Sequence, residues 1–428
     1  MASCDLGGAL TLDEAQGQLA ARLLPMVSVE TVPLSGALGR ILAAPVVAKH
    51  PLPGFDNSAM DGYAVRLADL QQQRILSQVG KAFAGQPYLG SWPAGSTIRI
   101  MTGAPIPEGC DAVVMQEQTR LLAAAEPALR DALPFVEFLA QVEAGQNIRR
   151  QGEDVVAGQS LLRAGLAITA RELPLLAALG CSEVSVYRPL RVAFFSSGDE
   201  LRPVGSELAL GQIVDSNRYA IAALLQRLGC EALDLGIIAD DKAALRAAFL
   251  RADEEADVLI TSGGVSVGEA DYTKEILREL GEVEFWRVAI KPGKPFACGR
   301  LTGAANGRWF FGLPGNPVSA LVTFMLLVRP ALERLMGKEA SEPLRLQARC
   351  HDSLRLSAGR IDFQRGIARS DASGLLGVTL AGGQGSAMFT SLSQANCLIR
   401  LDASHYPGQV LLPAGSLVTI ELFDEVLR

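Results

Sequence analysis

The sequence has little histidine and no paired-cysteine motif. Its three histidines, His50, His351 and His405, are far apart, and none stands at metal-ligand spacing. The seven cysteines are odd in number and scattered, and no CxxC occurs. These absences argue against a zinc ribbon and against a disulfide framework, so free thiols in a reducing compartment fit best. Any bound metal is expected to be a hard cation on oxygen ligands.

An excess of positive charge and long apolar segments are also missing. The formal net charge is −7 and the pI about 5.3, which speaks against nucleic acid or an anionic membrane surface as the main partner. The longest apolar run, 318–328, is far shorter than the roughly 20 residues of a membrane span, and residues 1–15 lack the pattern of a signal peptide. We therefore expect a soluble, cytoplasmic protein. Its 428 residues predict two to four domains.

The pattern of apolar residues, and with it the predicted secondary structure, changes along the chain. Residues 11–24 have helical periodicity, and residues 61–165 read as short strands and turns. Residues 121–133 are rich in Ala and Leu and fit either a helical insertion or a poorly ordered loop. From 190 to 335 strands and helices alternate, which predicts a mostly parallel sheet covered on both faces. The expected strands cover 191–195, 232–238, 258–261 and 283–290, the expected helices cover 215–228, 241–255, 271–280 and 316–335, a hairpin covers 296–311, and a small β domain begins near 340.

Four loops follow the ends of these strands and are expected to meet in one crevice. They are 196–200, 240–241, 261–271 and 313–317. The third loop, TSGGVSVGEAD, combines glycines with hydroxyl donors, which suits a phosphate. Taken alone, it fits a ligand-free glycine turn about as well. Asn316 followed by Pro317 is likewise an ordinary helix start.

Charged residues gather in the same loops. Asp199, Glu200, Asp240 and Asp271 form a carboxylate set of the kind that Mg²⁺ prefers beside a phosphate, although helix caps and solvated loop charges explain each one singly. Two lysines lie in KPGKP (291–295), a stiff turn directly after an apolar strand. A fixed pair beside acidic loops favours an anionic ligand over two solvated surface lysines.

Taken together, the motifs resemble those of the molybdopterin molybdenumtransferase family, which includes the E domain of gephyrin. The resemblance spans nearly the whole chain in order. It is carried by PGFDNSAMDGYAV (53–65), RIMTGAPIPEGCDAVVMQE (99–117), NIRRQGED (147–154), SSGDEL (196–201), GQIVDSN (211–217), TSGGVSVGEADYTK (261–274), IKPGKPF (290–296), GLPGNPVSA (312–320), GRIDFQRG (359–366) and GQGSAMFTSL (383–392).

The resemblance implies a multidomain α/β plus β architecture and a homodimer. A central α/β molybdopterin-binding domain with a mostly parallel sheet is expected to be flanked by a β-rich domain, a connecting domain and a C-terminal β-barrel-like domain. The active crevice is expected between the α/β domain of one subunit and β domains of the other. The expected boundaries are 7–26 and 190–338 for the α/β domain, 50–145 for the β-rich domain, 27–49 and 146–189 for the connecting domain, and 339–428 for the C-terminal domain.

The resemblance also implies roles for individual residues. Catalytic roles fall on Asp61, Thr102, Glu200, Asp240, Asp271 and Lys291, with Glu200, Asp240 and Asp271 as Mg²⁺ ligands. Two departures from the family pattern are visible: Arg287 stands where the family usually has Lys, and Ala387 where it commonly has His. Substrate-binding roles fall on Thr261, Ser262, Gly263, Gly264, Ser266, Gly268, Arg287, Lys294, Pro314, Gly315, Asn316, Pro317, Arg365 and Ser386.

The implied reaction inserts molybdate into adenylylated molybdopterin and releases AMP, with Mg²⁺ as cofactor. Lys291, Lys294 and Arg287 are candidates to hold the molybdate dianion. Transient contacts with molybdopterin adenylyltransferase and with molybdoenzyme-maturation proteins are further implied. Two alternatives stay open on the sequence: adenylylation of molybdopterin from ATP, and a non-catalytic scaffold of the gephyrin type. The sequence does not separate molybdate from tungstate.

Overall fold

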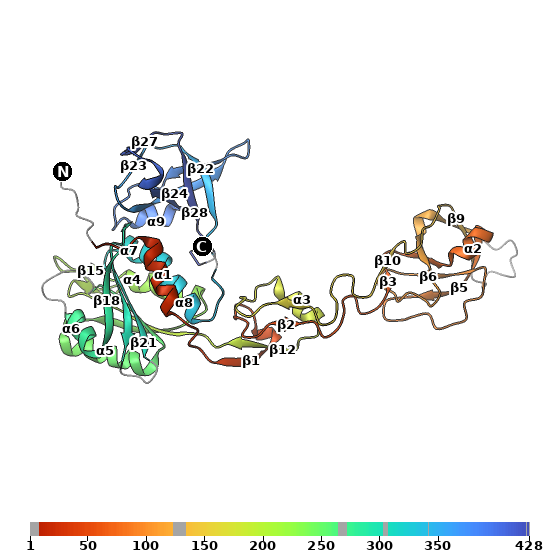
Figure 1. Ribbon diagram of the computed structural model, residues 1–428, viewed down its shortest axis with the longest axis horizontal. Helices are drawn as coiled ribbons and strands as arrows, with labels where there is room; N and C mark the ends of the chain where they lie inside the picture. Colours follow the sequence, from red (N-terminus) through yellow and green to blue (C-terminus); the bar gives the residue numbers. More distant parts are fainter. Residues whose placement is uncertain are drawn as a thin grey trace. The chain divides into compact units, whose positions relative to one another are not determined.

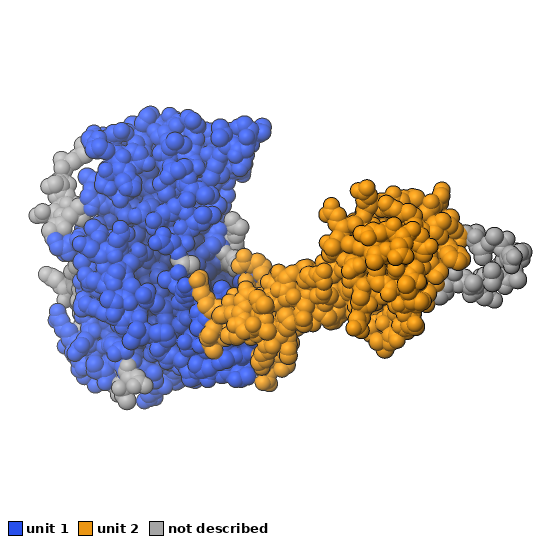
Figure 2. Space-filling view, turned by 45° about the vertical axis from the view of Figure 1, so that its right-hand side comes forward, with its two compact units in different colours: residues 1–43, 164–169, 184–428 blue, residues 44–163, 170–183 orange. Residues whose placement is uncertain are grey.

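The computed structural model describes residues 8–122, 134–263, 272–302, 307–340, 342–424 and 426–427. These residues form two compact units, drawn in blue and orange in Figure 2. Unit 1 comprises residues 1–43, 164–169 and 184–428, and unit 2 comprises 44–163 and 170–183. The architecture expected from the sequence, multidomain α/β plus β, is confirmed, whereas the four proposed domain boundaries stay a prediction.

Unit 1 contains a six-stranded sheet with the strand order β16-β13-β17-β21-β20-β18. Its parallel part consists of β16 (Glu231–Ile238), β13 (Arg191–Ser197), β17 (Val258–Ser262) and β21 (Arg308–Leu313), and β20 (Pro295–Leu301) and β18 (Gly281–Arg287) add an antiparallel edge. In the register, Ser262 lies opposite both Ser196 and Leu313. The carboxyl ends of the parallel strands therefore meet at one edge of the sheet, as the sequence predicted.

Helices cover both faces of this sheet (Figure 1). Phe194, Ile260 and Phe311 belong to one buried cluster, and the residues just before them in each strand belong to another. Because successive side chains of a strand alternate between faces, each parallel strand supplies both cores. The first cluster includes residues of α1 (Leu12–Arg22), α4 (Asn217–Arg227), α7 (Pro317–Thr323) and α8 (Arg329–Leu335), and the second includes residues of α5 (Lys242–Glu255) and α6 (Tyr272–Leu280).

Local chemistry explains where several helices begin. Thr11 and Glu14 form a reciprocal capping box at the start of α1. The Asp241 carboxylate accepts hydrogen bonds from the backbone N–H groups of Ala243 and Ala244, in the first turn of α5. The helix predicted at 316–335 is continuous, because a π-helical turn, η4 (Phe324–Val328), joins α7 to α8. No helix among the described residues is both long and apolar enough to cross a bilayer.

The C-terminal region forms a closed five-stranded barrel, as expected. Its strand order is β24-β25-β22-β28-β26, and β26 pairs back to β24. A two-residue strand, β19 (Ile290–Lys291), joins the barrel to the α/β region by pairing with β24. The barrel strands are β22 (Arg345–Cys350), β24 (Ile361–Ser370), β25 (Leu376–Leu380), β26 (Cys397–Asp402) and β28 (Leu417–Leu422), accompanied by β23 (Leu354–Arg355), β27 (Leu411–Leu412) and α9 (Phe389–Gln394).

Unit 2 is rich in strands, as the turn-rich pattern predicted. Its main sheet has the order β7-β4-β6-β5-β9-β8. Of residues 121–133, predicted as a helical insertion or a loop, the first two are the last residues of a strand instead, and 123–133 lie outside the described residues. The sheet strands are β4 (Gly62–Val65), β5 (Ile75–Ala82), β6 (Ser96–Ile100), β7 (Ala112–Met115), β8 (Thr119–Leu122) and β9 (Phe135–Phe138).

Smaller elements complete both units. In unit 2, α2 (Leu67–Gln72) and α3 (Glu172–Ala178) accompany two strand pairs. In unit 1, β1 (Val29–Pro33) pairs with β12 (Glu183–Tyr187), and β14 (Leu201–Arg202) pairs with β15 (Ile213–Val214). The pairs of unit 2 are β2 (Val46–Val47) with β11 (Ser160–Leu162) and β3 (Asn57–Ser58) with β10 (Ile148–Arg149).

Candidate functional site at the carboxyl edge of the sheet

A cavity of about 900 Å³ opens at the carboxyl edge of the parallel strands in unit 1. All four loops singled out in the sequence contribute to its described lining. So do the KPGKP turn and the barrel residues Ala387 and Phe389. The prediction of one shared crevice is therefore confirmed. The polar and charged residues of its lining are Ser196, Ser197, Glu200, Asp215, Ser216, Asn217, Asp240, Ser262, Lys294, Asn316 and Ser319.

Two of the three predicted metal ligands, Glu200 and Asp240, line this cavity. Asp199 is absent from the described lining, and its carboxylate accepts a hydrogen bond of 3.2 Å from the Asp240 backbone N–H. The third predicted ligand, Asp271, lies outside the described residues. Within the described residues no cluster of three or more metal-ligating side chains occurs.

The glycine loop approaches the neighbouring strand very closely. Gly263 has a φ of +89°, and a Cβ added there would lie 2.5 Å from the Ser197 carbonyl oxygen, so this position requires glycine. Gly263 and Ser262 line the cavity. Thr261 is buried, and its hydroxyl has no hydrogen-bond partner within the described structure. Gly264, Ser266 and Gly268 lie outside the described residues.

The loop after β21 begins α7 in the predicted manner, with one difference. Asn316 occupies the N-cap position and Pro317 the first helical position, but the Asn316 side chain makes no capping hydrogen bond. Asn316 is exposed and lines the cavity together with Pro314, Gly315 and Pro317. The residue therefore starts the helix through its backbone while its amide group stays at the cavity.

Of the predicted cationic residues, one lines the cavity and another contacts the C-terminal region. Lys294 lines the cavity. The Lys291 ammonium lies 2.9 Å from an Asp362 carboxylate oxygen and 3.3 Å from the Ser357 hydroxyl, both in the C-terminal region. Lys291 and Arg287 are absent from the described lining of the cavity. Their assignment to the anion stays a prediction, and the described contact of Lys291 is with the barrel.

Arg365 is almost completely buried, and its side chain hydrogen-bonds the loop that leads to the cavity residue Ala387. Its guanidinium donates to the carbonyl oxygens of Gly383 (3.0 Å) and Gly385 (2.9 Å) and to the Ser391 hydroxyl (3.2 Å). Burial lowers the pKa of this guanidinium from its usual value. The Ser386 carbonyl, in turn, accepts a hydrogen bond of 3.0 Å from the Val318 N–H of α7. These contacts place Ala387 and Phe389 at the cavity.

The other two predicted catalytic residues, Asp61 and Thr102, lie together in unit 2. One Asp61 carboxylate oxygen accepts hydrogen bonds of 2.8 Å from both the backbone N–H and the hydroxyl of Thr102. The backbone hydrogen bond, followed by that of the hydroxyl, lowers the pKa of Asp61. The carboxylate is thereby kept ionised and oriented.

Sequence reasoning missed the polar residues at the start of α4. Asp215 is buried and accepts hydrogen bonds of 3.0 Å from the Ser196 hydroxyl and from Arg218 Nε. Asn217 donates 2.7 Å hydrogen bonds to Ser262 Oγ and to the Gly315 carbonyl. A signal was present, because Asp-Ser-Asn directly precedes an apolar helical pattern, but that pattern alone indicates only the start of a helix.

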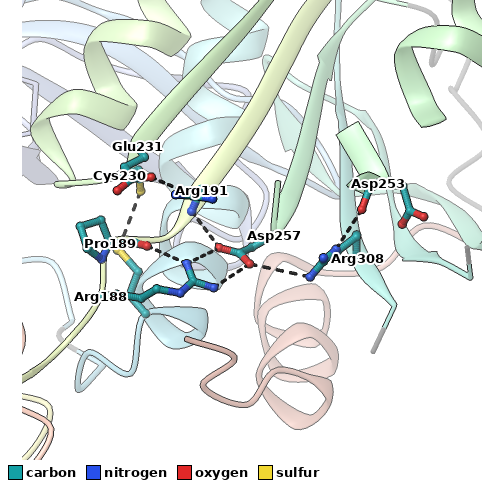
Figure 3. A network of polar contacts seen from close by, with 9 residues as sticks. Arg188, Pro189, Arg191, Cys230, Glu231, Asp253, Asp257 and Arg308 are labelled. Atoms are coloured by element: carbon teal, nitrogen blue, oxygen red, sulfur yellow. Dashed lines mark hydrogen bonds and ion pairs between the residues drawn. The ribbon is translucent and has the colours of Figure 1, made fainter. Parts of the chain in front are cut away.

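A second network was also missed, around the buried Asp257 at the amino-terminal edge of the same sheet (Figure 3). Arg188 donates to both carboxylate oxygens of Asp257, at 2.7 and 2.9 Å, and the Arg191 backbone N–H adds a bond of 2.9 Å. Burial alone would raise the pKa of Asp257, but the hydrogen bonds from Arg188 and Arg191 outweigh it and lower the pKa. Arg308 approaches the same carboxylate to 3.8 Å.

The fold and the cavity together define a class: open α/β proteins whose ligand site lies beyond the carboxyl ends of the parallel strands. Family models match in three consecutive parts, namely "MoeA N-terminal region (domain I and II)" over residues 10–180, "Probable molybdopterin binding domain" over 200–334 and "MoeA C-terminal region (domain IV)" over 347–423.

Relatives cover the chain from end to end. A molybdopterin molybdenumtransferase of Haemophilus influenzae is 47% identical over 98% of this chain and 100% of its own. One from Nostoc sp. is 38% identical over 91% of this chain and 88% of its own. A crystal structure of a molybdopterin biosynthesis MoeA protein from Pyrococcus horikoshii superposes with a TM-score of 0.75 at 30% identity, over 97% of this chain and 99% of that one. The chain belongs to the molybdopterin molybdenumtransferase (MoeA) family.

Proposed function

We propose that the protein is a molybdopterin molybdenumtransferase, which inserts molybdate into adenylylated molybdopterin and releases AMP. The observation that carries this proposal is the cavity at the carboxyl edge of the sheet, which all four predicted loops line in a chain 47% identical to a relative of that name. The cavity volume of about 900 Å³ lies within the usual range of small-molecule sites.

Different residues of the lining suit the phosphate of the pterin substrate and the molybdate dianion. At the end of β17, Gly263 brings backbone close to the cavity, and Ser262 adds a hydroxyl. These groups suit the phosphate-bearing part of the pterin substrate. Lys294, which lines the cavity, is our candidate to receive the molybdate dianion, and Lys291 and Arg287 remain further candidates on the resemblance alone.

We place Mg²⁺ with Glu200, Asp240 and Asp271. Hard carboxylate oxygens are the donors that Mg²⁺ takes in proteins, and the two described members of this set line the same cavity. When bound, the ion would neutralise charge on the phosphoryl oxygens of the nucleotide. Asp215 is not part of this set, because Ser196 and Arg218 already occupy its carboxylate.

The protein is further proposed to act in the cytoplasm as a homodimer. The Asp61–Thr102 pair belongs to unit 2, whereas the cavity belongs to unit 1. In our proposal, the pair of one subunit completes the cavity of the partner. Transient contact with molybdopterin adenylyltransferase would pass on the adenylylated substrate without release.

The decisive experiment supplies purified protein with adenylylated molybdopterin, molybdate and Mg²⁺ and measures AMP together with molybdenum in the isolated pterin product. Stoichiometric AMP and pterin-bound molybdenum are expected. Pyrophosphate release from ATP and molybdopterin, without molybdenum insertion, would overturn the proposal. Metal analysis of the product formed with equal molybdate and tungstate then defines the preferred oxyanion.

A further inference from the structure

Asn217 lies where two loops of the cavity approach each other. It is the first residue of α4, it is 9% exposed, and it lines the cavity. Its amide nitrogen lies 2.7 Å from Ser262 Oγ, at the end of β17, and 2.7 Å from the Gly315 carbonyl oxygen, after β21. One side chain therefore spans the glycine loop and the loop that begins α7.

The chemistry of the two partners fixes the direction of these hydrogen bonds. A backbone carbonyl only accepts, so the Asn217 atom beside Gly315 must be the NH₂ group. The same nitrogen faces Ser262 Oγ, which accordingly accepts its second proton. A serine hydroxyl has a single proton of its own, and no acceptor for that proton is found within the part of the chain that the structure describes. Because Ser262 lines the cavity, its proton is left for a ligand.

We infer that Asn217 is a positioning residue that makes the Ser262 hydroxyl a hydrogen-bond donor to a phosphate oxygen of the pterin substrate. This inference rests on the proposed function, since it takes a phosphate-bearing ligand as given. The neighbouring Asp215 holds Ser196 at the end of β13 in a similar way, so the start of α4 organises three strand ends. Asn217 differs from Asp215 in supplying donors, which orient the hydroxyl toward an anion.

The substitution Asn217→Asp tests this inference with almost no change of volume. An aspartate cannot donate to Ser262 and instead accepts the serine proton, which withdraws that proton from the ligand. It also faces the Gly315 carbonyl with negative charge. We expect the dissociation constant of molybdopterin to rise about tenfold to a hundredfold, the effect of losing a hydrogen bond to a charged group.

A double-mutant cycle separates positioning from general loosening. Molybdopterin binding is measured anaerobically for the wild type, N217D, S262A and the double variant, with melting temperatures in parallel. If Asn217 acts through Ser262, N217D and S262A weaken binding to similar extents and the double variant is no weaker than the weaker single one. Asn396→Asp serves as the matched control, since Asn396 is a barrel amide bonded to the backbone of Ala368.

Each result has a defined meaning. Wild-type affinity in N217D, or losses that multiply in the double variant, would overturn the inference. Should N217D fail to fold, S262A alone decides, because unchanged molybdopterin binding without the hydroxyl removes the donor from the proposal. A wild-type protein that binds no molybdopterin would instead defeat the proposed function.

Discussion

The two edges of the sheet in unit 1 use carboxylates in opposite ways. At the amino-terminal edge, Asp257 is buried, and Arg188 and the Arg191 backbone occupy both of its oxygens. At the carboxyl edge, Glu200 and Asp240 line an open cavity. A buried carboxylate bonded on both oxygens contributes to folding, whereas a carboxylate that lines a cavity lies where a ligand would bind. The difference teaches that charge alone does not mark a site; burial and the place of the charge in the fold do.

The largest expected effect is on stability, from breaking the Arg188–Asp257 ion pair at the amino-terminal edge of the sheet. Asp257→Ala leaves Arg188 without its bidentate partner. Removing one member of a buried ion pair costs about 3–5 kcal/mol, and because the Arg188 side chain is 29% exposed, the cost here should lie at the lower end, about 3 kcal/mol. We expect the free energy of unfolding, measured in urea, to fall by about that amount. Because this network lies at the edge of the sheet opposite the cavity, the folded variant should bind molybdopterin with wild-type affinity. Unchanged stability would contradict this assignment.

The second prediction concerns the carboxyl edge. Asp240→Asn removes one charge and one oxygen ligand from the proposed Mg²⁺ site, so the rate should fall about a hundredfold, with a higher Mg²⁺ requirement. The melting temperature should change little. Asp371→Asn is the control, since Asp371 caps an exposed turn of the barrel. An unchanged Mg²⁺ dependence in Asp240→Asn would remove Asp240 from the site.

A third prediction separates the two lysines of the KPGKP turn. Lys294→Ala should raise the half-saturating molybdate concentration about tenfold, as expected for one lost charge-assisted hydrogen bond. Lys291→Ala removes the bond to Asp362 and should lower the melting temperature with a smaller effect on molybdate. Steady-state assays and thermal unfolding of both variants provide the comparison. If Lys291→Ala raises the half-saturating molybdate concentration more than Lys294→Ala does, Lys291 and not Lys294 binds the molybdate.

The smallest expected effect is at the Asp61–Thr102 pair, in which the Asp61 carboxylate is hydrogen-bonded and only partly exposed. Thr102→Ala removes the hydroxyl donor and keeps the backbone one, so the pKa of Asp61 should rise part of the way toward its ordinary value. Since the folded pKa is the lower one, the stabilisation is present above the unfolded pKa and is lost as pH falls through the folded pKa. Carboxyl-carbon NMR titration of both proteins measures the shift, and an identical pKa in the two would exclude the hydroxyl as a cause.

Much of the carboxyl edge could be predicted from the sequence, and the amino-terminal edge could not. Alternating strands and helices fix a parallel sheet, and a parallel sheet forces the loops after its strands to one edge. That is local periodicity combined with a topological rule. The Arg188–Asp257 pair joins residues far apart in the chain, and neither lies in a recognisable pattern. The same holds for Lys291, whose partner Asp362 is supplied by the barrel, and for Asn217, whose two acceptors come from separate loops.

The short pairing of β19 with β24 has a consequence for the order in which the molecule matures. Ala387 and Phe389, which complete the cavity wall, belong to the C-terminal barrel, and that barrel joins the α/β region through this pairing. During synthesis, the four loops of the sheet leave the ribosome well before those two residues. A nascent chain that has not yet reached residue 387 therefore holds a pocket whose wall is incomplete.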